Sequence, residues 1–154
     1  MYRARPEHMD DKTRAFVSHQ RVARLATASL SARPVVVPIC YAFDGENIYS
    51  PLDEKPKSTD VRSLKRVRNI EANPQVSVVV DEYSEDWNKL TYVLIAGVAE
   101  ILEPGDEPGE HSRAVSLLRE KYVQYCSMAI ESRPMIKISS LKTRRWSSDP
   151  NRAD

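Results

Sequence analysis

The strongest candidate for chemistry is the segment at residues 50–58, with the sequence SPLDEKPKS. Lys55 and Lys57 lie in it, after an expected strand and directly before an expected helix that carries further cations. The free N–H groups at a helix start have a partial positive charge, so the helix dipole and the lysines would together hold a phosphate. The segment therefore predicts an anion site. A solvated basic loop, with Ser58 as the helix N-cap, explains the same residues and stays open.

A second candidate is the apolar segment at residues 34–43, PVVVPICYAF, which contains a proline. Pro38 cannot donate a hydrogen bond to a neighbouring strand, so we expect it at a bulge or at a sheet edge where the backbone is partly free. A flat heterocyclic ring could pack there and bond to the backbone. The alternative is a proline on an edge strand that binds nothing.

Trp87 and Trp146 stand in polar surroundings, SEDWNK and TRRWSS. Large amphipathic rings in such places cover a ligand or a subunit contact, or they close the end of a core. The sequence leaves both interpretations open.

Other kinds of chemistry are not indicated. Cys40 and Cys126 have few neighbouring cations that would activate a thiolate, and the three histidines lack the spacing of metal ligands. The sequence contains no P-loop, GxGxxG or GxSxG motif, and we assign no catalytic side chain and no metal. Any chemistry must therefore come from a bound cofactor.

Composition limits the class of protein. The chain has 154 residues, 41% hydrophobic and 29% charged, with a net charge of +1. We expect one globular domain over residues 1–154, with no nucleic-acid partner, because no strong positive field is present. No segment is apolar for long enough to span a membrane, and the first residues, MYRARPEHMDDK, lack the apolar centre of a signal peptide. We expect a cytoplasmic protein.

The elements that must position these residues follow the order β-β-β-α-β-β-α-β after an N-terminal helix. We expect strands over residues 22–28, 34–43, 47–50, 75–81, 90–102 and 135–146, and helices over 6–19 (within 1–20), 58–72 and 110–125. Asp44 and Gly45 indicate a hairpin turn, Gly97 a bulge, and the strand 75–81 should be buried on both faces. Residues 147–154 should be a frayed tail. Helices interrupt the strands only twice, so the sequence predicts a mainly β protein with an antiparallel barrel of about six strands and two to three helices.

An ordered set of short sequences resembles the pyridoxamine 5′-phosphate oxidase-like superfamily. These are VARLAT (22–27), RPVVVPI (33–39), DEKPK (53–57) and RNIEANPQV (68–76). Within the superfamily the chain is most similar to the branch of probable deazaflavin (coenzyme F-420)-dependent reductases, and DEYSEDW (81–87) and the closing RW (145–146) strengthen that placement. The resemblance runs from about residue 22 to residue 146.

The resemblance implies an FMN-binding type of split β-barrel that forms a homodimer, with two equivalent cofactor sites in the dimer interface. By this analogy Lys55 and Lys57, with Ser50 beside them, bind the cofactor phosphate, and Arg62 or Arg68 steers a polyanionic tail. Val37, Pro38 and Ile39 line the ring system. Trp87 and Trp146 close the site, one or both from the second subunit.

The function that the resemblance implies is that of an oxidoreductase passing a hydride from reduced coenzyme F-420 to a small organic acceptor. Two alternatives remain: an FMN-dependent oxidoreductase of the same superfamily, and a binding protein for a flavin or tetrapyrrole without turnover. We recognise no substrate signature of a pyridoxine-phosphate oxidase near the C-terminus, so vitamin B6 oxidation is not expected. Tyr41 and Tyr92 are candidates for a proton donor by strand position alone.

Overall fold

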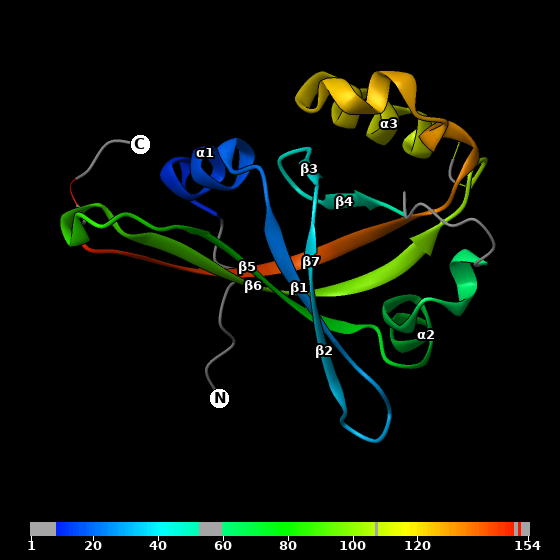
Figure 1. Ribbon diagram of the computed structural model, residues 1–154, viewed down its shortest axis with the longest axis horizontal. Helices are drawn as coiled ribbons and strands as arrows, with labels where there is room; N and C mark the ends of the chain where they lie inside the picture. Colours follow the sequence, from blue (N-terminus) through cyan, green and yellow to red (C-terminus); the bar gives the residue numbers. More distant parts are fainter. Residues whose placement is uncertain (1–8, 53–59, 107, 150, 152–154) are drawn as a thin grey trace, which may run out of the picture.

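The computed structural model describes residues 9–52, 60–106, 108–149 and 151, and these form a curled antiparallel sheet with three α-helices (Figure 1). The strands are β1 (Ala23–Ala28), β2 (Pro34–Ile39), β3 (Ala42–Phe43), β4 (Ile48–Pro51), β5 (Gln75–Glu82), β6 (Thr91–Leu102) and β7 (Met135–Ser147). The helices are α1 (Asp11–His19), α2 (Lys65–Ala72) and α3 (Glu110–Lys121). None of the helices in the described ranges is long and apolar enough to cross a membrane.

The sheet has the strand order β2-β1-β5-β6-β7-β4-β3. Its two end strands, β2 and β3, follow each other in the chain with only Cys40 and Tyr41 between them. The sheet must therefore curl until its ends approach, and the predicted mainly β split barrel is confirmed.

The sheet has seven strands where about six were expected, because the segment 34–43 breaks at Tyr41. The ring of Tyr41 is fully buried, and its hydroxyl donates to the carbonyl of Val17 in α1. Its backbone N–H donates to the hydroxyl of Tyr122, at 3.2 Å, rather than to a neighbouring strand. These bonds satisfy the backbone where the ladder is interrupted.

Burial alternates along the strands. In β6, Val93 and Ile95 face the core, whereas Leu94 and Val98 face outward and are at least one-third exposed. The expectation that residues 75–81 are buried on both faces is wrong, since Gln75 and Ser77 are exposed. The reason is that no described element covers this outer face of the sheet.

The predicted bulge at Gly97 is confirmed. The pairing of β6 with β7 shifts register between Ala96 and Val98, so Ser140 and Leu141 together oppose Gly97. Ser140 adopts a left-handed conformation (φ 54°), which turns the bulged strand.

The helices are shorter than expected. The helix expected over 58–72 is wrong over residues 60–64, because residues 60–63 close a separate turn: Asp60 accepts the N–H of Arg62 at 3.1 Å, and Ser63 donates to the carbonyl of Asp60 at 2.6 Å. Leu64 is then extended. Residues 58 and 59 lie outside the described part. The helix expected over 110–125 ends at Lys121, where an extended Tyr122 leads into a 3₁₀ turn, Val123–Ser127.

The two ends of the chain depart from expectation in different ways. At the N-terminus, α1 begins after Asp10, whose carboxylate accepts the N–H of Thr13 at 2.7 Å, and residues 1–8 lie outside the described part. The expected fraying of the tail is wrong for residues 147 and 148. β7 continues to Ser147, and the N–H of Ser148 donates to the carbonyl of Leu90 at 2.9 Å.

Candidate functional site

β2 provides the free sheet edge that the position of Pro38 predicts. This strand ends the strand order, so its second edge has no strand partner among the described residues. Pro38 lies opposite Arg24 of β1 and points to the outer face, where it is exposed. The side chains of Val37 and Ile39 point into the core instead, and Ile39 is 7% exposed. A ring placed against the outer face would therefore meet Pro38 and the backbone rather than these two side chains.

Ser50 connects β4 to the end of β2. It is buried, and its hydroxyl donates to the carbonyl of Cys40 at 2.8 Å, so only its oxygen lone pairs remain free to accept. Two residues later the chain enters the segment with Lys55 and Lys57, which lies outside the described residues.

A buried ionic network fixes the part of β4 that leads to this segment. Lys137 of β7 contacts Glu110 of α3 at 2.7 Å, and the hydroxyl of Tyr49 donates to the same carboxylate oxygen at 2.8 Å. Burial acts to raise the pKa of the Glu110 carboxyl, but the hydrogen bonds from Lys137 and Tyr49 outweigh it and leave the pKa below its ordinary value. Burial, followed by the bond to Glu110, raises the pKa of Tyr49. The carboxylate is thus ionised and holds β4, β7 and α3 together.

The two arginines expected to steer an anion differ in their partners. Arg62 forms ion pairs with Glu71, at 3.2 Å, and with Glu103. Arg68 in α2 is exposed and forms no ion pair with any residue that the structure describes. Within the described part of the chain, carboxylates therefore balance the charge of Arg62 but not that of Arg68.

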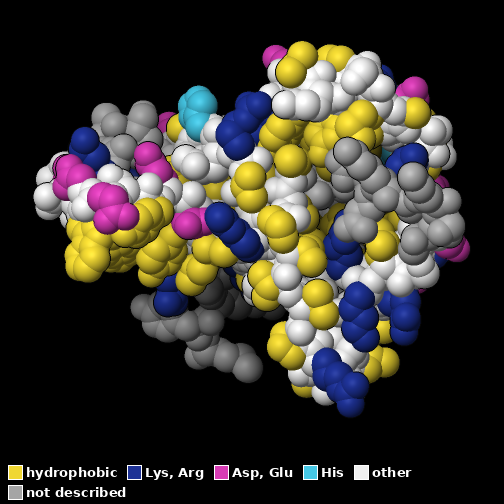
Figure 2. All heavy atoms as spheres, viewed as in Figure 1, with side chains coloured by type: hydrophobic (Ala, Val, Ile, Leu, Met, Phe, Trp, Pro, Cys, Tyr) yellow, Lys and Arg dark blue, Asp and Glu magenta, His cyan; other side chains and the backbone are white. Residues whose placement is uncertain are grey.

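The outer face of the sheet is defined by two rows of directly opposed residues. One row is Pro38, Arg24, Val79, Leu94 and Arg144; the other is Val36, Ala26, Ser77, Ala96 and Lys142. Over β5–β7 this face has a shallow groove of about 440 Å³, whose lining includes Leu94, Lys142 and Arg144. The ends of β5, β6 and β7 extend to the left in Figure 1, and hydrophobic side chains gather along the lower edge of this extension in Figure 2. The face thus combines apolar surface with the cations Lys142 and Arg144, neither of which forms an ion pair with a residue that the structure describes.

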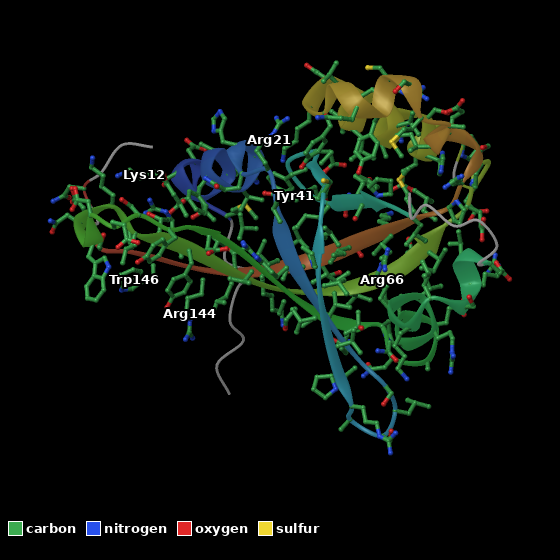
Figure 3. All side chains as sticks on the ribbon, viewed as in Figure 1. Lys12, Arg21, Tyr41, Arg66, Arg144 and Trp146 are labelled. Carbon is green, nitrogen blue, oxygen red and sulfur yellow. The ribbon has the colours of Figure 1, made fainter. Side chains whose placement is uncertain are left out.

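Trp146 lies on this outer face, on the same side of the strands as Arg144 (Figure 3). It is 44% exposed and stacks on its cross-strand neighbour Tyr92, with 5.4 Å between ring centroids. Trp87 lies in the 3₁₀ turn Trp87–Lys89 between β5 and β6 and is 71% exposed. Neither indole closes the core.

One chain does not bring these residues together. Four strand spacings separate β2 from β7, so Pro38 is roughly 19 Å from Arg144 and Trp146 of β7 along the curved sheet. No group of three or more metal-ligating side chains occurs in the described ranges.

Residues 9–148 match the family described as pyridoxamine 5′-phosphate oxidase. The chain belongs to this family. No curated protein sequence matches it. Among solved structures, a conserved hypothetical protein of Mycobacterium tuberculosis is 22% identical with a TM-score of 0.69, and the match covers 99% of this chain and 97% of that one. A FAD-binding protein of Mesorhizobium loti is 26% identical with a TM-score of 0.61, over 86% and 89% of the two chains.

Relatives in this fold bind different ligands. The haem storage protein HutZ of Vibrio cholerae is 16% identical with a TM-score of 0.64, over 91% of this chain and 94% of that one. An F420 reductase is 19% identical with a TM-score of 0.57, over 88% and 95%. At identities this low, these solved structures show the fold that they share with this chain and not the ligand that it binds. The ligand must be argued from the residues of the chain itself.

The sequence analysis missed several residues of the outer face, namely Arg24, Leu94, Lys142 and Arg144. Side chains two positions apart on a strand lie on the same face. This spacing places Leu94 on one face with Tyr92 and Ala96, and Arg144 on one face with Lys142 and Trp146, and it could have been read from the sequence. Only the register between strands shows that they share one surface.

Proposed function

We propose that the protein is an oxidoreductase that binds coenzyme F-420 and reduces a small organic acceptor. The observation that carries this proposal is the outer face of the sheet, with a free strand edge at Pro38 and a stacked aromatic pair beside Arg144. Membership of the family, and relatives described as F420 reductase and FAD-binding, support a flavin-like ligand.

Each group of residues has a distinct task in this proposal. The free edge of β2 offers backbone N–H and C=O groups to the polar edge of a flat heterocycle, and Pro38 packs against it. Lys55 and Lys57 bind the phosphate, and Arg68 attracts the anionic tail because, unlike Arg62, it is paired with no carboxylate of the described residues. When bound, the reduced deazaflavin supplies a hydride to the acceptor. The chain's own contribution is to hold the two reactants in contact and to exclude water.

We also propose that a second copy of the chain covers the outer face and completes the site. Val36, Leu94, Val98, Tyr92 and Trp146 are each at least 36% exposed there. Pairing two such faces about a two-fold axis would bring Trp146 of the partner subunit towards Pro38, across a separation that one chain cannot bridge. The ligand would then lie between an edge strand and an indole, shielded from water.

The test is a fluorescence titration of the purified protein with coenzyme F-420 and, separately, with FMN. We expect tight binding of F-420, weak binding of FMN, and oxidation of the reduced coenzyme when an acceptor such as a quinone is added. Preference for FMN would assign the protein to the flavin enzymes. Binding of either coenzyme without any oxidation of its reduced form would assign the protein to the ligand carriers.

The lysine assignment has its own variant. We expect Lys55→Ala/Lys57→Ala to weaken F-420 binding by about 100-fold, because two charge-assisted bonds to a phosphate are removed. Lys12→Ala removes an exposed lysine of α1 and should leave the affinity unchanged. Equal affinity in the double variant and the parent would show that the phosphate is bound elsewhere.

A further inference from the structure

Lys121, the last residue of α3, has a buried amine for which the described residues provide no hydrogen-bond acceptor. Its Nζ atom exposes less than 1 Å² and bonds to none of the residues that the structure describes. A lysine ammonium has three N–H donors, and leaving them all unsatisfied inside a protein is costly. Groups of this kind need an explanation, and a bound ion is one.

A second cation lies on the same aromatic cluster. The Nζ of Lys121 is 3.9 Å from the ring centroid of Tyr41 and 5.4 Å from that of Tyr122, and the guanidinium carbon of Arg21 is 4.7 Å from the centroid of Tyr122. Figure 3 shows Arg21 and Tyr41 in the region between α1 and α3. The ring faces stabilise the cations in part, but they offer no acceptor atom to an N–H group.

The hydroxyls of the two tyrosines are committed elsewhere. Tyr41 donates to the carbonyl of Val17, and Tyr122 donates to the carbonyl of Arg21 at 2.8 Å while it accepts the N–H of Tyr41. The cluster is therefore rigid around its two cations.

The charges of this cluster are not balanced. The groups that act on Lys121 are Arg21, Cys40 and the two tyrosines, and no carboxylate among the described residues pairs with either cation. Burial and, second, repulsion from Arg21 lower the pKa of Lys121 to about 8. An anion between the two cations would replace this repulsion with two attractions.

We propose that Lys121 and Arg21 form a binding site for a small oxyanion, a carboxylate or phosphate group held beside the ring of Tyr122. The residues of this site, at the end of α3 and before β1, are different from those assigned to the cofactor phosphate. The site stands or falls independently of the identity of the cofactor.

Proton uptake distinguishes this site from simple surface attraction. Above pH 8 much of Lys121 is neutral, and an anion that binds it must raise its pKa, so binding takes up protons from the solvent. Sulfate is the suitable probe for the phosphate-like case, because it does not titrate in this range, and acetate is the probe for the carboxylate case.

The experiment is calorimetric titration of the full chain with each probe at constant ionic strength, at about pH 7 and about pH 9, in two buffers of different protonation enthalpy. We expect saturable binding that is tighter at the lower pH, with uptake of a fraction of a proton at the higher pH. The probe that binds more tightly identifies the source of the oxyanion. Absence of binding by both probes, or binding without proton uptake at the higher pH, would overturn the proposal.

Three variants locate the site. Lys121→Met keeps the aliphatic chain and should weaken binding by about tenfold and abolish the proton uptake, and Arg21→Gln should weaken binding while preserving the uptake. Lys12→Met, in α1, should change neither quantity. Because a methionine suits a buried position, thermal unfolding should show Lys121→Met to be folded, and sulfate and acetate binding equal to the parent in that variant would refute the assignment.

Discussion

Gly97 is the residue on which the bend of β6 and β7 depends. A Cβ atom at this position would lie 2.5 Å from Cγ2 of Ile138 and 3.1 Å from the carbonyl oxygen of Ser139. Ile138 is fully buried and cannot move away without disturbing the core. The glycine is therefore required by close approach of the neighbouring strand.

Replacing Gly97 by alanine should lower the free energy of unfolding by about 1–3 kcal/mol, because the methyl group overpacks the bulge. Urea denaturation measures the change. Ala96→Ser, one position away on the exposed outer face, is the control and should have little effect. An unchanged urea midpoint for Gly97→Ala would mean that the bulge can relax.

Sequence reasoning at the residue scale succeeded where one residue type dictates its own surroundings. Pro38 had to be at an edge or a bulge, and it lies on an edge strand. The sequence could not show that Glu103 neutralises Arg62, because the two residues are 41 positions apart and only the fold brings them together. Lys121 was missed for the same reason: nothing in its neighbouring residues indicates that its amine is buried.

The turn between β1 and β2 holds one residue, Ala32, in an unfavourable backbone conformation. Ala32 adopts a left-handed conformation (φ 57°), and its N–H donates to the carbonyl of Ser29 at 3.0 Å. A Cβ atom is unfavourable in this conformation, whereas glycine adopts it freely.

Ala32→Gly should raise the free energy of unfolding by about 0.5–1 kcal/mol, since relief of the left-handed strain exceeds the added entropy of the unfolded chain. Ala28→Gly, in the adjoining strand, should lower it by a similar amount. Thermal or urea unfolding of the pair gives a matched comparison. Destabilisation by both substitutions would show that the turn is not strained.

Elements were predictable where local pattern and tertiary packing agree. Both β6 and β7 were predicted to within one residue at each end, and β7 shows the period-two alternation typical of a sheet with one buried face. The bounds of α2 and α3 failed because tertiary contacts ended the helices: Asp60 caps a separate turn, and Tyr122 leaves the helix to place its hydroxyl between Tyr41 and Arg21. The phosphate-binding role of Lys55 and Lys57 stays a prediction, as both lie outside the described residues.

At the scale of the whole molecule, the outer face is the feature that one chain leaves unexplained. It carries apolar side chains along β2, β6 and β7 together with Arg144 and Lys142. Contiguous apolar surface of this kind marks an interaction site. The proposed second copy would use it.

Leu94→Glu should weaken the proposed dimer by at least about 100-fold, because a carboxylate would replace an apolar contact and lose its water in the interface, a cost that pairing with Arg144 on the neighbouring strand only partly offsets. Sedimentation equilibrium measures the dissociation constant. Leu30→Glu is the matched control: Leu30 is 80% exposed in the β1–β2 turn, and the same substitution there should leave the assembly intact. A dimer that survives Leu94→Glu but not Leu30→Glu would place the interface at the hairpin.

The position of β7 also has a consequence for biosynthesis. This last strand does not lie at an end of the strand order but between β6 and β4, and Ile48 pairs with Ile138. A chain emerging from the ribosome can assemble β2, β1, β5 and β6 early, but the pair of β3 and β4 cannot join this sheet until β7 is synthesised. Completion of the sheet should therefore wait for β7 and be slow, as pairings between distant segments are. Until then the nascent chain exposes both the edge of β6 and the apolar side of β4, which makes it a natural client for chaperones.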